Sequence, residues 1–142
     1  FIFYNKVAKQ DMISLFGKKN VDSAIKFQLE ELRSSLWIND HGKFTKWALP
    51  DEIQYAPVHS FLKDNNNILL GGNTYKIKPQ FGRQDASFGW SFNITPKDGK
   101  PTFSKPESLN INGQIRQIQK LGEKYIFAMN NDKIKVCIIN KR

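Results

Sequence analysis

Hydrophobic residues change their spacing near residue 34 of the chain. Before that point they recur three and four positions apart, which is the spacing of one helix face, at Val21, Ala24, Ile25, Leu29 and Leu32. A shorter apolar run over residues 11–16 ends at Gly17, the residue type that most often follows a helix C-terminus. We therefore predict a short helix that ends at Gly17, and an amphipathic helix over residues 20–33 that packs on a core by one face.

Beyond residue 34 the pattern predicts strands. Apolar and polar residues alternate over short segments, and clusters of Asn, Asp and Gly separate these segments. Short strands joined by tight turns are typical of antiparallel sheets. The predicted strands are residues 35–39, 43–48, 57–62, 67–73, 88–95, 101–105, 114–121, 124–129 and 133–140.

An internal repeat relates these strands. The segment Trp37–Lys46 reads as a strand, an Asp- and Gly-containing turn and a second strand, and Phe92–Lys105 follows the same plan. Ile68–Asn73 likewise matches Tyr125–Asn130. The offset is about 55 to 57 residues, a period that belongs to repeat architectures such as β-propeller blades.

The repeat predicts a mostly β fold of antiparallel, four-stranded, blade-like sheets, a partial β-propeller with a short helical N-terminal segment. Residues 1–34 form the helical segment, and residues 35–142 form two blades and a fraction of a third. A propeller needs four or more blades to close. We therefore expect the chain to be the C-terminal part of a larger protein, whose remaining blades, or a second copy, cover the open sheet edges.

A longer motif carries a family resemblance. Residues 69–89 read LLGGNTYKIKPQFGRQDASFG, and this run resembles the last repeats of bacterial VCBS/FG-GAP repeat proteins. Residues 36–44, 113–118 and 130–132 resemble the flanking turns and strands of the same family, so the likeness extends over roughly residues 11 to 140. The resemblance implies an integrin-α-like β-propeller and an exported location, either periplasmic or at the cell surface.

The family's blade loops often hold calcium through several carboxylates, and here this chain departs from the pattern. The equivalent stretch, residues 59–67, keeps one carboxylate, Asp64, and the turns at Asp40, Asp98 and Asp132 also carry one each. Calcium favours oxygen-rich loops with several carboxylate ligands. We therefore expect plain polar turns, and no metal or other cofactor.

The charge of the chain limits its partners without naming one. Its net charge is +9 and its pI is about 9.7, a balance that attracts nucleic acid, anionic lipid or acidic glycans. The lysines are spread along the chain, so solvated lysines on β-surfaces are favoured over a nucleic-acid footprint. The apolar runs are only a few residues long, so we expect no transmembrane segment. Cys137 is the single cysteine, which excludes a disulfide within the chain and a cysteine-based zinc site.

The loop over residues 76–87 is the best candidate site, because long connections on a rigid β scaffold often carry function. Arg83 offers a planar fork for a carboxylate, a phosphate or a pair of sugar hydroxyls. Alternatively, Arg83 pairs with Asp85 or with the backbone and only pins the loop. We expect the glycines of this region to serve tight turns or close backbone approach. The candidate ligand-binding residues are Asn73, Tyr75, Lys78, Gln80, Arg83 and Asp85.

Catalytic motifs are missing from the sequence. His41 lies in a predicted turn and His59 in a predicted strand, and neither has a nucleophile motif around it. We therefore expect a non-catalytic binding module of an exported or cell-surface protein, with a carbohydrate or a protein as its ligand. Two alternatives stay open: a basic module that binds nucleic acid or acidic glycan, and a purely structural segment with the loop over residues 76–87 buried against neighbouring blades.

Overall fold

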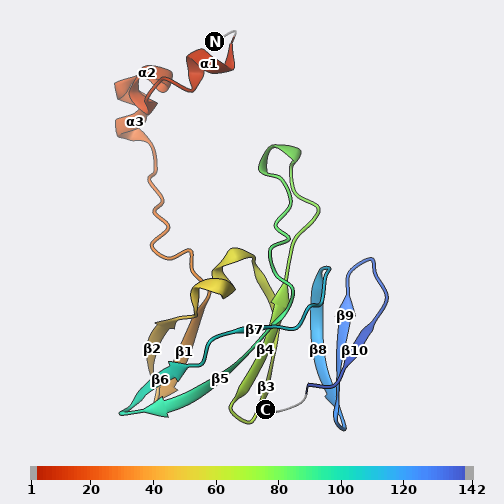
Figure 1. Cartoon of the computed structure of the whole chain (residues 1–142). Coiled ribbons are helices and arrows are strands. Elements are labelled where there is room, and N and C mark those ends of the chain that lie inside the picture. Colours follow the sequence, from red (N-terminus) through yellow and green to blue (C-terminus); the bar gives the residue numbers. More distant parts are fainter. Residues whose placement is uncertain (1–2, 140–142) are drawn as a thin grey trace. The chain divides into compact units, whose positions relative to one another are not determined.

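The computed structural model describes residues 3–139 of the chain (Figure 1). The chain divides into two compact units, Phe1–Leu32 and Arg33–Arg142. The units are described separately below, and the candidate site belongs to the second.

Three short helices make up the regular structure of the first unit: α1 (Tyr4–Val7), α2 (Met12–Phe16) and α3 (Lys18–Ser23). The side chain of Asp11 caps the start of α2 by accepting a hydrogen bond from the backbone N–H of Ser14 at 2.7 Å. Gly17 ends α2 with a positive φ of 78°, which glycine adopts at little cost. The predicted short helix that ends at Gly17 is thus confirmed.

The predicted amphipathic helix over residues 20–33 is wrong. Helical structure stops at Ser23, and the chain has no regular secondary structure from residue 24 to residue 34. Ile25, Phe27 and Leu29 are 82, 92 and 81% exposed. Short helices in proteins are stabilised mainly by burial of an apolar face, and these side chains bury almost none of their surface. These three side chains also alternate with polar residues. Alternation is typical of extended backbone, just as spacings of three and four are typical of a helix.

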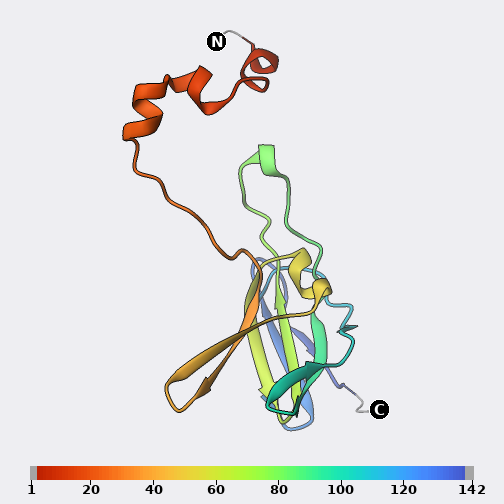
Figure 2. The same cartoon turned by 90° about the vertical axis from the view of Figure 1, so that its left-hand side faces the viewer.

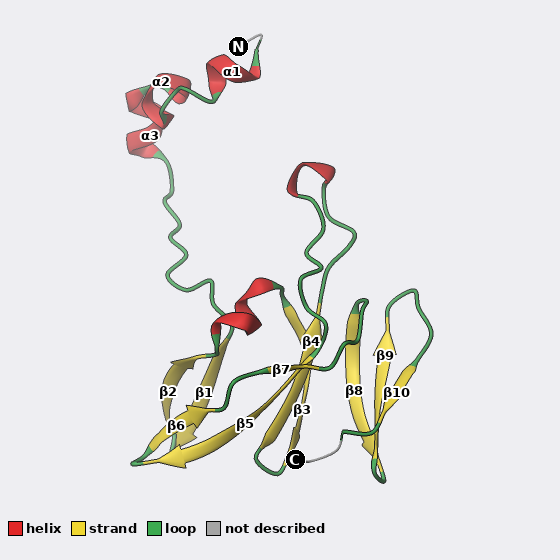
Figure 3. Cartoon of the chain, viewed as in Figure 1, coloured by secondary structure: helices red, strands yellow, loops and turns green. Residues whose placement is uncertain are grey.

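The described part of the second unit holds ten strands in three antiparallel sheets (Figure 3). The first sheet is the hairpin of β1 (Ser35–Asp40) and β2 (Lys43–Ala48), which a 3₁₀ helix, η1 (Asp51–Tyr55), connects to the central sheet. The central sheet runs in the order β3 (Val58–Asp64), β4 (Asn67–Gly72), β5 (Trp90–Lys97) and β6 (Lys100–Phe103), with β7 (Glu107–Ser108) also paired to β5. The third sheet contains β8 (Ile115–Leu121), β9 (Lys124–Met129) and β10 (Lys135–Cys137).

This architecture confirms the predicted mostly β class, its antiparallel sheets and its short N-terminal helices. Nine of the strands overlap the predicted segments, and only the two-residue β7 was not expected. The last residue of the predicted strand over 133–140 lies outside the described residues.

The hairpins occur in two matching kinds. The turn between β1 and β2 has positive φ at His41 and Gly42, and the turn between β5 and β6 has positive φ at Asp98 and Gly99, as a type I′ turn requires. In the other kind, β3–β4 and β8–β9, the register shifts near the start of the first strand. The β1–β2 hairpin is therefore repeated by β5–β6, and the β3–β4 hairpin is repeated by β8–β9.

Strand β4 is buried on both of its faces. Leu69, which is fully buried, belongs to one apolar cluster together with Ile118 and Phe127 of the third sheet. Its neighbours Ile68 and Leu70 belong to a second cluster with Ile53 and Phe92, among others. Successive side chains of a strand point to opposite faces of its sheet, so the central sheet has an apolar core on each side. Figure 2 shows this sheet alongside the blue strands of the third sheet.

Two adjacent glycines at the end of β4 permit close contact. A Cβ atom on Gly71 would overlap the Ile115 side chain of β8, and one on Gly72 would overlap the backbone oxygen of Pro57. Close approach, one of the roles expected for these glycines, is confirmed. Gly71 therefore sets the distance between the central and third sheets at this point.

A polar cluster joins the central and third sheets at the opposite end of β3. The Asp64 carboxylate accepts hydrogen bonds from the Tyr125 hydroxyl at 2.6 Å and from the Lys120 ammonium at 2.9 Å. Tyr125 is 3% exposed. Its hydrogen bond to Asp64, with burial as the second cause, raises the pKa of Tyr125 from 10.0 to about 12.

We expect the substitution Gly71→Ala to destabilise the protein by about 1–3 kcal/mol, because the added methyl overlaps Ile115 across the sheet interface. No positive φ complicates the interpretation at Gly71. The second substitution Ile115→Val removes the methyl that the new Cβ meets, so the double variant should recover part of the loss. Chemical denaturation of the four proteins measures this coupling, and strictly additive losses would contradict the contact.

The Tyr125→Phe variant should be less stable than the native protein below pH 10, because it loses the hydrogen bond to Asp64. A raised folded-state pKa contributes stability that is complete below the unfolded value of 10.0 and is lost as pH rises towards about 12. The difference in melting temperature between the two proteins should therefore shrink between pH 10 and pH 12. The exposed Tyr55 supplies the control Tyr55→Phe, and a difference that stays constant with pH would refute the assignment.

Candidate functional site

The connection from β4 to β5, residues 73–89, is the longest between described strands and extends beyond the end of the central sheet (Figure 1). An isolated β-bridge between Thr74 and Gln84 closes its base, with backbone N–O distances of 2.8 and 3.0 Å. Its tip is a single 3₁₀ turn, η2 (Pro79–Phe81), which ends at Gly82 with a φ of 67°. The loop therefore consists of two paired legs and a tight turn.

Asn73 holds both legs of the loop to the rest of the fold. Its side-chain oxygen accepts a hydrogen bond from the Ser87 N–H at 3.0 Å, and its amide donates to the Ser87 and Gly113 carbonyls at 2.7 and 2.9 Å. The Arg116 guanidinium donates to the Asn73 carbonyl at 3.0 Å. The residue is 1% exposed and has a left-handed φ of 79°. The Asn73 side chain therefore serves the fold and does not reach a ligand from the surface.

Arg83 lies on the ring of Tyr75. The guanidinium carbon is 4.2 Å from the ring centroid, within the range of a cation–π interaction. No ion pair between Arg83 and Asp85 is present in the described structure. Tyr75, on one leg of the loop, thus positions Arg83 on the other leg.

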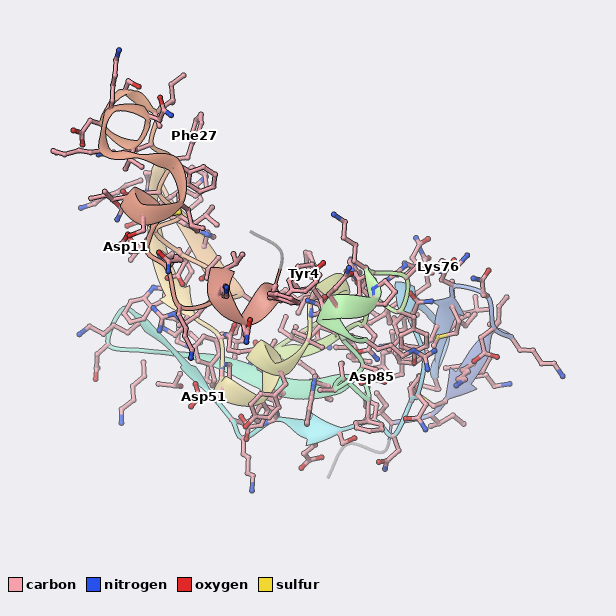
Figure 4. The ribbon with its side chains drawn as sticks, turned by 90° about the horizontal axis from the view of Figure 1, so that it is seen from above. Tyr4, Asp11, Phe27, Asp51, Lys76 and Asp85 are labelled. Atoms are coloured by element: carbon pink, nitrogen blue, oxygen red, sulfur yellow. The ribbon has the colours of Figure 1, made fainter. Side chains whose placement is uncertain are left out.

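The remaining predicted residues lie along the exposed outer part of the loop. Lys78, Gln80 and Asp85 all have exposed side chains. Figure 4 places Lys76 and Asp85 on this green segment, seen from above. The structure therefore brings Tyr75 and Arg83 together, and it does not gather Lys78, Gln80 and Asp85 around them.

A cavity of about 530 Å³ lies at the base of the loop. We call it the loop-base pocket. It lies between the loop and the third sheet, and its volume is within the range of small-molecule sites. Its wall consists of Tyr75, Lys76 and Arg83 from the loop, and Asn112, Gly113, Gln114, Asn130, Asn131, Asp132 and Lys135 from the following chain.

Several polar groups of this wall are fixed by contacts within the protein. Gln114, which is 4% exposed, accepts hydrogen bonds through its side-chain oxygen from the Tyr75 N–H at 3.1 Å and from Arg116 at 3.0 Å. The Lys135 ammonium donates to the Asn112 carbonyl at 2.5 Å and lies 3.4 Å from the Asp132 carboxylate. The hydrogen bond from the backbone N–H of Lys133 is the main cause that lowers the pKa of Asp132. These contacts fix the side of the pocket that lies opposite the loop. The lowered pKa keeps the Asp132 carboxylate charged.

No sequence pattern groups the pocket residues opposite the loop with the loop itself. Gln114, Asp132 and Lys135 follow the loop by several tens of residues. The sequence predicts a turn at residues 130–132, which also resemble the family's flanking turns, and the structure has a turn there. Only the packing of the third sheet against the central sheet brings them to Arg83.

A second, apolar cavity of about 750 Å³ lies between the β1–β2 hairpin and the central sheet. We call it the hairpin groove. Trp37 and Phe61 on its wall are 58 and 71% exposed. Large aromatic side chains with this much exposure mark a surface suited to further packing.

His59 and Cys137 also have shifted pKa values, and neither residue lines the loop-base pocket. Burial, followed by the charge of Arg116, lowers the pKa of His59, whose Nε2 is 2.9 Å from the Thr74 hydroxyl. Burial raises the pKa of the Cys137 thiol, which packs against the core of the third sheet. Among residues 3–139, no three His, Cys, Asp or Glu side chains gather in a way that suits a metal ion.

The substitution Asn73→Asp should destabilise the fold by about 1–3 kcal/mol or more. The carboxylate has no hydrogens to donate, so it would face the Ser87 and Gly113 carbonyls without bonding to them. Asn110→Asp makes the same chemical change at an exposed residue that also has a positive φ, and it should have little effect. Thermal unfolding compares the two variants, and equal melting temperatures would contradict the anchoring role of Asn73.

Comparisons of the chain with protein-family models, with curated proteins and with solved structures find no match. None of the helices in the described part of the chain has the length and apolar character needed to cross a membrane.

Proposed function

We propose that this chain is a non-catalytic, ligand-binding module of an exported protein, built from propeller-type blades, and that carbohydrate binds in the loop-base pocket. The observation that carries the proposal is the composition of that pocket. An aromatic ring and cationic side chains from the loop face several amide side chains from the segment before β8 and from the turn between β9 and β10. Side-chain amides and the N–H groups of a guanidinium are suited to hydrogen bonds with sugar hydroxyls.

The arrangement of the sheets supports the propeller-type interpretation. The central sheet runs in sequential order from β3 to β6 and carries apolar clusters on both faces. The two kinds of hairpin recur in the order expected for a preceding and a following blade. Both features agree with the resemblance to VCBS/FG-GAP repeat proteins, from which the exported location is proposed.

The exposure of the loop supports a binding role. Residues 78–86 are exposed within the described chain, so a ligand or a partner could reach them. A protein partner would contact this exposed outer part, and Phe81, 77% exposed at the tip, would suit it. Carbohydrate is favoured because the loop-base pocket is concave and most of its lining residues carry polar side chains.

We propose that the module associates with the rest of its protein, or with a second copy, through the hairpin groove. Its apolar wall and exposed aromatics would be covered by further blade strands, which the parent protein or a second copy of this chain would supply. The basic anion-binding alternative also draws on a specific observation, because Lys76, Arg83 and Lys135 all line the loop-base pocket.

A glycan array tests the proposal directly. The native protein should bind a defined subset of sugars, and Arg83→Ala should lower that binding by about tenfold through loss of charged hydrogen bonds. Lys100→Ala removes a charge from the exposed β5–β6 turn, away from the pocket, and should leave the signals unchanged. Equal signals for the native and Arg83→Ala proteins would exclude this pocket, and silence across the array would overturn the carbohydrate proposal.

A further inference from the structure

We infer that the loop-base pocket selects a sugar that carries a carboxylate. This inference rests on the proposed function, and it adds the chemical class of the ligand. It depends on the balance of charge in the wall, on the position of Arg83 and on the neutral groups that surround the cations.

Cationic groups outnumber carboxylates in the pocket wall. Lys76, Arg83 and Lys135 line it, against the single carboxylate of Asp132. Asp132 is already engaged, because it accepts a hydrogen bond from the Lys133 N–H at 2.7 Å and lies 3.4 Å from Lys135. Within residues 3–139, Lys76 and Arg83 form no ion pair. The pocket therefore has an excess of positive charge that an anionic ligand would balance.

The Arg83 guanidinium is held in place before any ligand arrives. Its position over the Tyr75 ring, 4.2 Å from the centroid, restricts the side chain. Tyr75 is fixed in turn through its backbone N–H, which donates to the buried Gln114 side chain. The Arg83 side chain forms no ion pair within the described residues, so its N–H groups are not committed to a carboxylate of this chain. The planar edge of a guanidinium matches the two oxygens of a carboxylate, with little entropy to lose on binding.

The neutral part of the wall favours a sugar as the carrier of that carboxylate. Asn112, Asn130 and Asn131 line the pocket and have exposed side chains, so their amides are accessible as donors and acceptors for hydroxyl groups. A polyphosphate such as nucleic acid would instead require a row of cations that follows its backbone. Lys76 and Arg83 line the pocket from the loop and the asparagine amides line it from the following chain, so a carboxylated sugar ring could contact both.

The test pairs each acidic sugar with a neutral partner of similar shape. Isothermal titration calorimetry measures tri-galacturonic acid and 3′-sialyllactose, each against its own methyl ester, with single-stranded oligo-dT as the polyphosphate probe. The proteins are native, Arg83→Gln and Lys100→Gln, so that both variants lose one charge. Arg83 is exposed, so its substitution should leave the fold intact, and circular dichroism of both variants verifies this.

At least one acidic sugar should bind the native protein about tenfold or more tightly than its neutral partner, and the preference should persist in Lys100→Gln and disappear in Arg83→Gln. Equal affinity for acidic and neutral sugars would overturn the inference and leave the proposed function intact. Binding of oligo-dT alone, with a steep loss in added salt, would overturn it in favour of nucleic acid. If no probe binds, the inference fails. A silent glycan array would then show that the proposed function fails as well, whereas binding of neutral sugars on the array would leave the proposed function intact.

Discussion

The packing of β4 between two apolar clusters is the interaction on which the rest of this structure depends. Leu69 is buried towards the third sheet, while Ile68 and Leu70 are buried on the opposite side. Burial on both faces makes β4 a continuous apolar strand and not an alternating one. A strand of this kind needs cover on each side, and the third sheet supplies it on one side, whereas Ile53 of η1 supplies it on the other.

The loop-base pocket is a consequence of the same packing. Gly71 lets β8 approach the end of β4, and Asn73, two residues later, bonds to the Gly113 carbonyl just before β8. These contacts bring the loop legs, with Tyr75 and Arg83, next to the turn between β9 and β10. The Asp64–Tyr125 hydrogen bond joins the same two sheets at the other end of β3. The site is therefore positioned by the interface between the sheets and not by the loop alone.

Local patterns in the sequence were sufficient for the strands and turns of the second unit. Alternation and turn chemistry act over a few residues, and type I′ turns such as Asp98-Gly99 depend only on residues that tolerate positive φ. The helix predicted over residues 20–33 failed because its spacing described a possible apolar face without showing that anything covers it. Ile25 and Leu29 are exposed, and an uncovered face does not stabilise a helix.

The sequence predicts only the part of the candidate site that lies in the loop, because the other part depends on packing between sheets. The loop, with Tyr75 and Arg83, is one continuous segment, whereas Gln114, Asp132 and Lys135 reach it only through the sheet interface. Asn73 was grouped with the ligand-binding residues because it belongs to the same motif, yet its burial and its hydrogen bonds assign it to the fold. Sequence proximity could not separate these two roles.

The opposite burial of adjacent leucines offers the most direct test of the account. Methyl-resolved nuclear Overhauser spectra of the intact chain would report which protons lie near Leu69 and which lie near Leu70. The account predicts contacts from Leu69 to Ile118 or Phe127, and contacts from Leu70 to Ile53 or Phe92. Contacts from both leucines to the same set of side chains would contradict the packing of the third sheet on one face of β4, and the loop-base pocket, which depends on that packing, would be contradicted with it.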